Sequence, residues 1–178
     1  MSHPRIIYLL PLLLLLLGCS KNDDTASTKN ADVVKRQGQP DYTKTFDKKL
    51  MDRAIQKAND TLQDFITALQ NPRPTMSSFA VKKQFPAEKG GEHIWLIDVS
   101  WDGKAFTATV DNDPVDTKAV KIGDRVQVTP DELSDWMFVE NGSLHGGYTI
   151  RVLYYQASPE EQKEFRKHTS FSVPPIDF

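Results

Sequence analysis

The chain has 178 residues, with 22 Lys and Arg against 24 Asp and Glu, which gives a formal net charge of −2 at pH 7. Domains that bind nucleic acid gather Lys and Arg on one face, and the sequence has no such basic stripe, so we expect no nucleic-acid partner. The length suits one domain with one core behind a polar N-terminal segment. A single cysteine, Cys19, excludes an intramolecular disulfide.

Residues 1–18 resemble the signal peptide of a bacterial lipoprotein. The apolar run IIYLLPLLLLLLG follows Arg5, is shorter than the ~20 residues that span a bilayer, and is typical of a secretory signal. It leads into LLGCS, which is similar to the lipobox of bacterial lipoproteins. The resemblance implies cleavage before Cys19, attachment of fatty acyl chains such as palmitate to that residue, and a lipid-anchored protein in the cell envelope that faces the periplasm. Ser20 after the cysteine favours the outer membrane over the inner one. A plain secretory signal that happens to end in Cys is the alternative.

Residues 19–40 are polar and poor in large apolar side chains, which predicts a flexible tether. We expect the remaining residues, 41–178, to form a single α+β domain. Its first element is predicted to be one long helix over residues 46–69, because apolar residues recur there at steps of three and four. Asn71 and Pro72 follow and end it. Packing of this apolar stripe on the domain's own sheet is the favoured interpretation, and a membrane or a partner helix is the alternative.

Alternating sequences predict antiparallel strands in the middle of the chain. A strand over residues 77–85 precedes two alternating runs joined by Asp102-Gly103, which predicts a hairpin with a two-residue turn. The register of that turn would gather one apolar face, made of Trp95, Ile97, Val99, Phe106, Ala108 and Val110. A further strand is predicted over residues 125–129.

The stretch 131–151, DELSDWMFVENGSLHGGYTIR, predicts a second hairpin that turns at Asn141-Gly142. Residues 148–155 fit both a strand and a helical face, and we favour the helix. Residues 158–161, SPEE, have the composition of a capping box with Pro at the first helical position, so a short C-terminal helix is expected to begin there.

The glycines of the second hairpin suggest a candidate binding notch. In the predicted register Gly146 and Gly147 lie across from Met137 and Trp136, which would leave space beside the indole. In one interpretation the glycines only allow close packing or a bulge. In the other they leave a cleft for a ligand, and Gly147→Leu would then abolish binding without lowering the melting temperature. The residues of this candidate site are Trp136, His145, Gly146, Gly147 and Arg151, with Asp135 at its rim.

No metal site and no cofactor are predicted. Cleavage leaves three His without ligand spacing, and the loop DNDPVD over residues 111–116 lacks the sixth-position Gly and the later Glu of a calcium loop. We therefore expect a non-catalytic binding or interaction module in the envelope. One alternative is a small envelope hydrolase that uses His145 with Glu140 or Asp135. A second alternative is an immunity or inhibitor lipoprotein that acts against a toxin.

Five short segments resemble the YegJ-like family of small bacterial proteins, a domain family of unknown function. They are EHIWL (92–96), NDP (112–114), IGD (122–124), LSDWM (133–137) and GGYTIR (146–151). The resemblance covers a core near residues 79–156 and implies a compact α+β domain, often on a lipoprotein. It implies no reaction and no site residues. The expected fold is a twisted antiparallel sheet or small open barrel, packed by one long N-terminal amphipathic helix and a short C-terminal helix.

Overall fold

The computed structural model describes residues 32–34, 42–44, 47–88 and 90–178. The predicted signal peptide and Cys19 lie outside the described residues. The first described elements are two short strands, β1 (Asp32–Val34) and β2 (Tyr42–Lys44), which pair antiparallel with each other.

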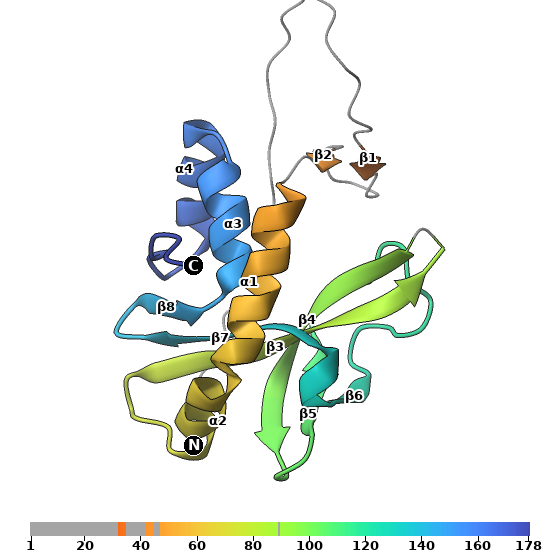
Figure 1. The fold of residues 1–178 in the computed structure, drawn as a ribbon, viewed down its shortest axis with the longest axis vertical. Coiled ribbons are helices and arrows are strands. Elements are labelled where there is room, and N and C mark those ends of the chain that lie inside the picture. Colours follow the sequence, from red (N-terminus) through yellow and green to blue (C-terminus); the bar gives the residue numbers. More distant parts are fainter. Residues whose placement is uncertain (1–31, 35–41, 45–46, 89) are drawn as a thin grey trace, which may run out of the picture.

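The domain is built on a six-stranded sheet in the order β6-β5-β4-β3-β7-β8. Every neighbouring pair is antiparallel, and β6 and β8 form the two ends, so the sheet is open. The strands are β3 (Met76–Ala87), β4 (Gly90–Trp101), β5 (Phe106–Val110), β6 (Arg125–Val128), β7 (Leu133–Glu140) and β8 (Ser143–Gly146). The helices are α1 (Lys48–Asp60), α2 (Leu62–Gln70), α3 (Tyr148–Gln156) and α4 (Pro159–His168), with a 3-10 turn over Pro130–Glu132. The α+β class with an open antiparallel sheet is therefore confirmed (Figure 1).

The prediction of one long N-terminal helix is wrong, because the helix breaks at Thr61 between α1 and α2. Thr61 has φ −110° and ψ 12°, and both its backbone N–H and its hydroxyl donate to the carbonyl of Lys57. A threonine side chain that bonds to the carbonyl four residues earlier competes with regular helix geometry. The apolar stripe nevertheless continues across the break, with Ala58 buried in α1 and Phe65 buried in α2.

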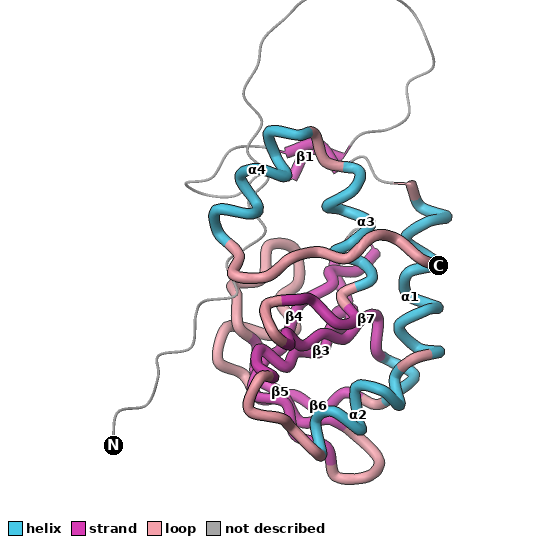
Figure 2. The backbone as a smooth tube through the Cα atoms, turned by 90° about the vertical axis from the view of Figure 1, so that its left-hand side faces the viewer, coloured by secondary structure: helices cyan, strands magenta, loops and turns pink. Residues whose placement is uncertain are grey.

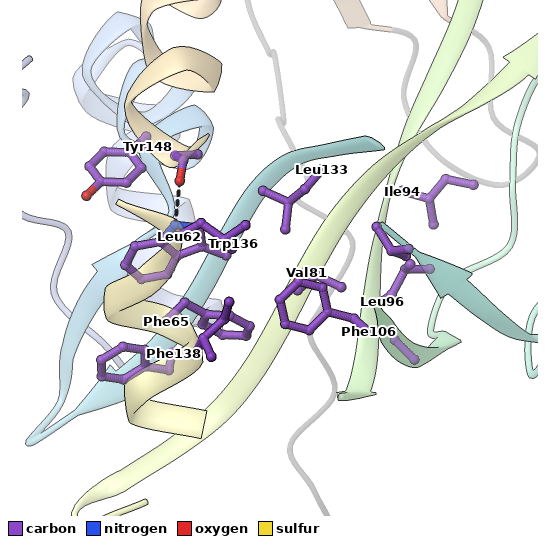
Figure 3. Packing of buried hydrophobic residues seen from close by; sticks show 14 of the residues in the cluster. Leu62, Phe65, Val81, Ile94, Leu96, Phe106, Leu133, Trp136, Phe138 and Tyr148 are labelled. Carbon is purple, nitrogen blue, oxygen red and sulfur yellow. Dashed lines mark hydrogen bonds between the residues drawn. The ribbon is translucent and has the colours of Figure 1, made fainter. Parts of the chain in front are cut away.

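The main core lies between the α1–α2 pair and one face of the sheet. Phe65 is fully buried at its centre, with ring centroids 5.4 Å from Trp136 and 5.8 Å from Phe106. Figure 3 shows Phe65 beside Trp136 and Phe138, with Phe106 farther along the sheet. The other face carries a smaller cluster, made of Ala80, Met137, Val139, Leu144 and Ile150. The preferred interpretation of the N-terminal apolar stripe, that it packs on the domain's own sheet, is confirmed.

The register predicted for the first hairpin is wrong. Trp101 pairs with Phe106, so the loop has four residues, 102–105, in place of a two-residue turn. The Asp102 carboxylate explains this loop, since it accepts the backbone N–H groups of Lys104 and Ala105 at 2.8 Å each. A register irregularity follows between Ile97 and Ser100.

The change of register moves β4 by one residue relative to the predicted core face. Leu96 pairs with Val110 and is fully buried, whereas Trp95 and Ile97 lie on the opposite face and are half-buried. Asp98, at φ 52°, is the left-handed residue of this irregularity. Phe106, Ala108 and Val110 are buried as expected. On β4 the buried side chains are those of Ile94 and Leu96.

The C-terminal part agrees with its prediction. Residues 148–156 are helical, and the capping box is complete, since the Ser158 hydroxyl accepts from Glu161 N and the Glu161 carboxylate accepts from Ser158 N. We call residues 170–178 the C-terminal segment. It contains no helix, and it touches β8 through a parallel bridge between Ser143 and Ser172. Figure 2 shows it as a long loop that leaves α4 and crosses the molecule to the C label.

Candidate functional site

A buried carboxylate joins strand β7 to the first turn of α3. Asp135 has no exposed surface and accepts four hydrogen bonds: from the backbone N–H groups of Trp136 (2.8 Å), Tyr148 (3.2 Å) and Thr149 (2.8 Å), and from the Thr149 hydroxyl (2.6 Å). It supplies the cap that Gly147, the residue before the helix, cannot provide. Burial raises the pKa of Asp135, while the hydrogen bonds and the charge of Lys82 act in the opposite direction. Asp135 therefore holds α3 on the sheet.

Lys82 extends this polar cluster across β3. It is the register partner of both Asp135 on β7 and Trp95 on β4. Its ammonium donates to the Thr149 hydroxyl at 3.1 Å and lies 5.3 Å from the centre of a Trp95 ring. The lysine thus brings a positive charge close to the buried carboxylate.

A serine–histidine contact lies next to this cluster, and sequence reasoning did not find it. The Ser134 hydroxyl is 2.9 Å from Nδ1 of His93 and donates to the Lys82 carbonyl at 3.2 Å. Because a hydroxyl has one proton, Ser134 accepts from an Nδ1–H of His93 in this arrangement. That tautomer does not activate the serine as a nucleophile. The signal that could have found the contact is the pairing of β3 with both β4 and β7.

The expected notch beside Trp136 is filled with side chains and backbone. Trp136 is 3% exposed, and its indole N–H donates to the Ala58 carbonyl at 2.8 Å. A Cβ on Gly146 would lie 2.3 Å from the Trp136 carbonyl oxygen, and one on Gly147 would lie 2.7 Å from Cδ2 of Leu144. Both glycines also have positive φ, 64° and 57°. The close-packing interpretation fits this geometry. The interpretation as an open cleft beside Trp136 does not fit it.

The hairpin itself has the predicted register, with Phe138 opposite His145 and Glu140 opposite Ser143. The His145 ring stacks on Phe138 at 4.7 Å between centroids with an interplanar angle of 5°, and its Nε2 is 3.8 Å from Glu140. Glu140 is held by Arg73, which donates Nε and Nη2 to the carboxylate at 2.7 and 2.8 Å. The hydrogen bond from Arg73 lowers the pKa of Glu140. A carboxylate with a lowered pKa in a bidentate ion pair is a weak general base.

Arg151 is a buried cation that meets the C-terminal segment. Its Nε donates to the Gly146 carbonyl at 3.0 Å, and its guanidinium lies 4.8 Å from the centre of the Tyr148 ring. Nη1 makes an ion pair with Asp177 at 3.0 Å, where the side chain of Arg151 is 8% exposed and that of Asp177 is 69% exposed. Arg151 also donates to the Pro175 carbonyl at 3.4 Å, so two residues of the C-terminal segment contact its guanidinium.

The acidic loop after β5 is held by a carboxylate from β4. The Glu92 carboxylate accepts the backbone N–H groups of Val115, Asp116 and Thr117 at 2.9–3.1 Å. The Thr117 hydroxyl donates to the Pro86 carbonyl at 2.6 Å. Glu92 thus organises the loop through its backbone. Within residues 47–88 and 90–178, no group of three or more His, Cys, Asp or Glu side chains could hold a metal ion.

Comparison with known proteins places this geometry in a family. Residues 47–173 match the family described as "Uncharacterized protein conserved in bacteria (DUF2314)". The chain belongs to this family. The match is wider than the expected core of residues 79–156 and takes in all four helices, so the family domain includes the α1–α2 pair and α4.

Two relatives extend the comparison. The "Uncharacterized protein YegJ" of Escherichia coli (strain K12) is 32% identical over 121 residues, which are 68% of this chain and 78% of that protein. A "Putative ankyrin repeat protein" of Neisseria meningitidis serogroup B is 40% identical over 73 residues, which are 41% of this chain and only 29% of that protein. The comparison with solved structures gave no match. The YegJ-like resemblance seen in the five segments is therefore confirmed.

Proposed function

We propose that this family member is a lipid-anchored protein of the bacterial cell envelope that binds a partner without transforming it. The observation that supports this localisation is the LLGCS sequence at residues 16–20. It ends an apolar run and contains the sole cysteine of the chain. Several acyl chains on Cys19 would hold the domain at a bilayer, since each buried methylene contributes about 0.8 kcal/mol. Among the helices of the described residues, none has the length and apolar character to cross a membrane.

A substitution of Cys19 tests the proposed lipid attachment and membrane localisation. We expect the native protein to lack residues 1–18, to carry fatty acyl chains at Cys19 by mass spectrometry, and to partition with membranes. Cys19→Ser should remain unacylated and leave the membrane fraction. Ser20→Ala is the matched control and should stay acylated, whereas Ser20→Asp should move the protein toward the inner membrane. An intact residue 1–18 segment or an unmodified thiol on the native protein would overturn the proposal.

The geometry favours a binding role over the hydrolase alternative. Asp135 is sealed in the β7–α3 junction, and Glu140 is committed to Arg73. His145 faces Glu140 across 3.8 Å but has an aromatic ring stacked on its flat side. These contacts commit the carboxylates of Asp135 and Glu140 to partners that hold the fold.

A pair of variants separates the two roles. We expect the wild-type protein and His145→Ala to show the same background rate with activated esters and with purified cell-wall fragments as substrates. Glu140→Gln should behave in the same way. Turnover by the wild type that His145→Ala abolishes, while its circular dichroism spectrum is unchanged, would establish the hydrolase and overturn the binding role.

A further inference from the structure

The C-terminal segment occupies a surface that has the features of a peptide-binding site. Two backbone hydrogen bonds join it to the β8 hairpin, from Leu144 N to Ser172 O (3.0 Å) and from Ser172 N to Gly142 O (2.8 Å). An extended chain that bonds to the outer edge of a sheet in this way uses the geometry of strand addition. Ser172 therefore contacts the β8 hairpin as one residue of an added strand would.

The far end of the segment supplies charge to a buried cation. Arg151 is 8% exposed at its side chain, and the carboxylate that pairs with it belongs to Asp177 of the segment. Without the segment, the polar contacts that the structure gives Arg151 reduce to the Gly146 carbonyl and the face of Tyr148. A buried guanidinium without a counter-charge is costly, so this position calls for a carboxylate from whichever chain covers it.

An aromatic side chain completes the contact. The Phe178 ring packs edge-on against Tyr148, with centroids 5.4 Å apart and an interplanar angle of 87°. Ile176 and Phe178 also pack against the main core while remaining only partly buried. The surface thus offers a strand edge, a buried cation and an aromatic face, and it fits an extended segment with an acidic residue followed by an aromatic one.

The segment is more exposed than the surface beneath it. Every residue from 170 to 178 is half-buried or exposed, whereas Leu144, Tyr148 and Arg151 are buried. The family match ends at residue 173, so the surface lies inside the matched domain and the residues that pair with Arg151 lie outside it. Asp177 and Phe178, which contact Arg151 and Tyr148, therefore lie beyond the family match, whereas Ser172 lies inside it.

We propose that the β8 edge and the first turn of α3 form an acceptor for an extended acidic–aromatic segment of a partner protein, and that residues 170–178 occupy this acceptor within the same chain. This rests on the proposed binding role and names its partner class. A partner segment of this chemistry displaces the C-terminal segment by supplying its own carboxylate to Arg151 and its own ring to Tyr148. Covalent attachment gives the internal segment a high effective concentration, so exchange requires that its hold be weakened or that the partner bind tightly.

The test uses the chain from residue 19 onward with Cys19→Ser, in solution without lipid, so its outcome does not depend on the membrane anchor. The probe is a labelled synthetic peptide, SFSVPPIDF, which copies residues 170–178. Asp177→Asn with Phe178→Ala removes the ion pair with Arg151 and the ring contact with Tyr148 at the end of the internal segment. We expect this double variant to bind the peptide at least tenfold more tightly than the wild type, and hydrogen exchange at the amides of Leu144 and Ser172 to become faster.

Two controls make the result specific. A peptide with Asn in place of its Asp should bind the double variant at least tenfold more weakly. Glu164→Gln, which breaks an exposed ion pair on α4 with Lys167, should leave peptide affinity and exchange at Leu144 unchanged.

Three outcomes would overturn the proposal. One is a double variant whose Leu144 and Ser172 amides stay as protected as in the wild type, because the segment would then be a fixed part of the fold. Another is peptide affinity that is equal for the Asp and Asn peptides. The third is a stable dimer of the double variant or wild type that exchanges its segments, which would make a second copy of this chain the occupant. A loss of lipidation in cells would affect none of these measurements.

Discussion

Removal of the Asp135 carboxylate should be among the most destabilising single changes in the domain. The carboxylate accepts four hydrogen bonds, and Asp135→Ala would leave three backbone N–H groups and the Thr149 hydroxyl without that acceptor. Each buried donor left unsatisfied costs about 1–3 kcal/mol, and loss of a helix cap costs about 0.5–2 kcal/mol. The wild type already bears the cost of burying Asp135, so we expect a net loss of about 3–5 kcal/mol.

The measurement is urea unfolding at pH 7, followed by tryptophan fluorescence. Because small domains unfold with about 5–15 kcal/mol, Asp135→Ala should shift the midpoint strongly or prevent folding. Asp135→Asn keeps one acceptor oxygen and should cost about 1–2 kcal/mol. Exposed Asp113→Ala is the matched control and should stay within about 0.5 kcal/mol of the wild type. A loss below about 1 kcal/mol for Asp135→Ala would refute the view that this carboxylate holds α3.

The same carboxylate has a pH signature. Burial raises its pKa in the folded state, so the folded protein binds the proton more readily than the unfolded chain does. Its contribution to stability is therefore largest below the unfolded pKa and declines as pH rises through the raised folded value. The stability difference between wild type and Asp135→Asn should shrink over that window. A stability difference between the two proteins that grows with pH would contradict a raised pKa of Asp135 in the folded state.

Two further predictions concern other contacts. Gly146→Ala should lose about 2–4 kcal/mol, since its Cβ would lie 2.3 Å from the Trp136 carbonyl oxygen, whereas Gly103→Ala meets nothing within 4 Å and should lose only about 1 kcal/mol in urea unfolding. Equal losses of stability for the two variants would mean that the positive φ alone, and not the close contact at Gly146, causes the loss. Arg73→Ala should raise the pKa of Glu140 toward its ordinary value, measured by carboxyl NMR titration. The wild type should lose the contribution of this ion pair as pH falls through the lowered pKa, and an unchanged Glu140 titration would argue against it.

The elements that the sequence predicted well are those fixed by local chemistry. Asn141-Gly142 supports its own two-residue turn, so the hairpin register followed directly. The Ser158 capping box needs only residues three positions apart. In these places the interactions that decide the structure are neighbours in the chain.

The predictions that failed depend on side chains whose hydrogen-bond partners cannot be identified from the hydrophobic pattern of the sequence. The Asp102 carboxylate bonds to two backbone N–H groups and lengthens its loop, which moves the core face of β4 by one residue. Thr61 breaks the helix, and its hydroxyl also contacts the Tyr148 hydroxyl at 3.0 Å, a contact between residues 87 positions apart. The composition of a strand or helix does not contain this information.

The candidate site shows the same division. The sequence predicted the strand that carries Asp135 and Trp136. Both side chains are structural, because α3 donates a backbone N–H to Asp135 and α1 supplies the carbonyl that accepts from Trp136. The sequence analysis chose Arg151 because it is near the glycines. The carboxylate that pairs with it belongs to Asp177, in the C-terminal segment. That pairing required the path of the C-terminal segment, which no local signal predicts.

The two ends of the sheet differ in what they offer to a neighbouring molecule. β6 is four residues long and has the exposed side chains of Arg125 and Gln127, features that discourage strands from joining edge to edge. At the opposite end, Ser172 already takes up hydrogen-bonding groups beside Leu144. Crowding many copies on one surface should therefore not nucleate ribbon-like aggregates unless that second end is first uncovered.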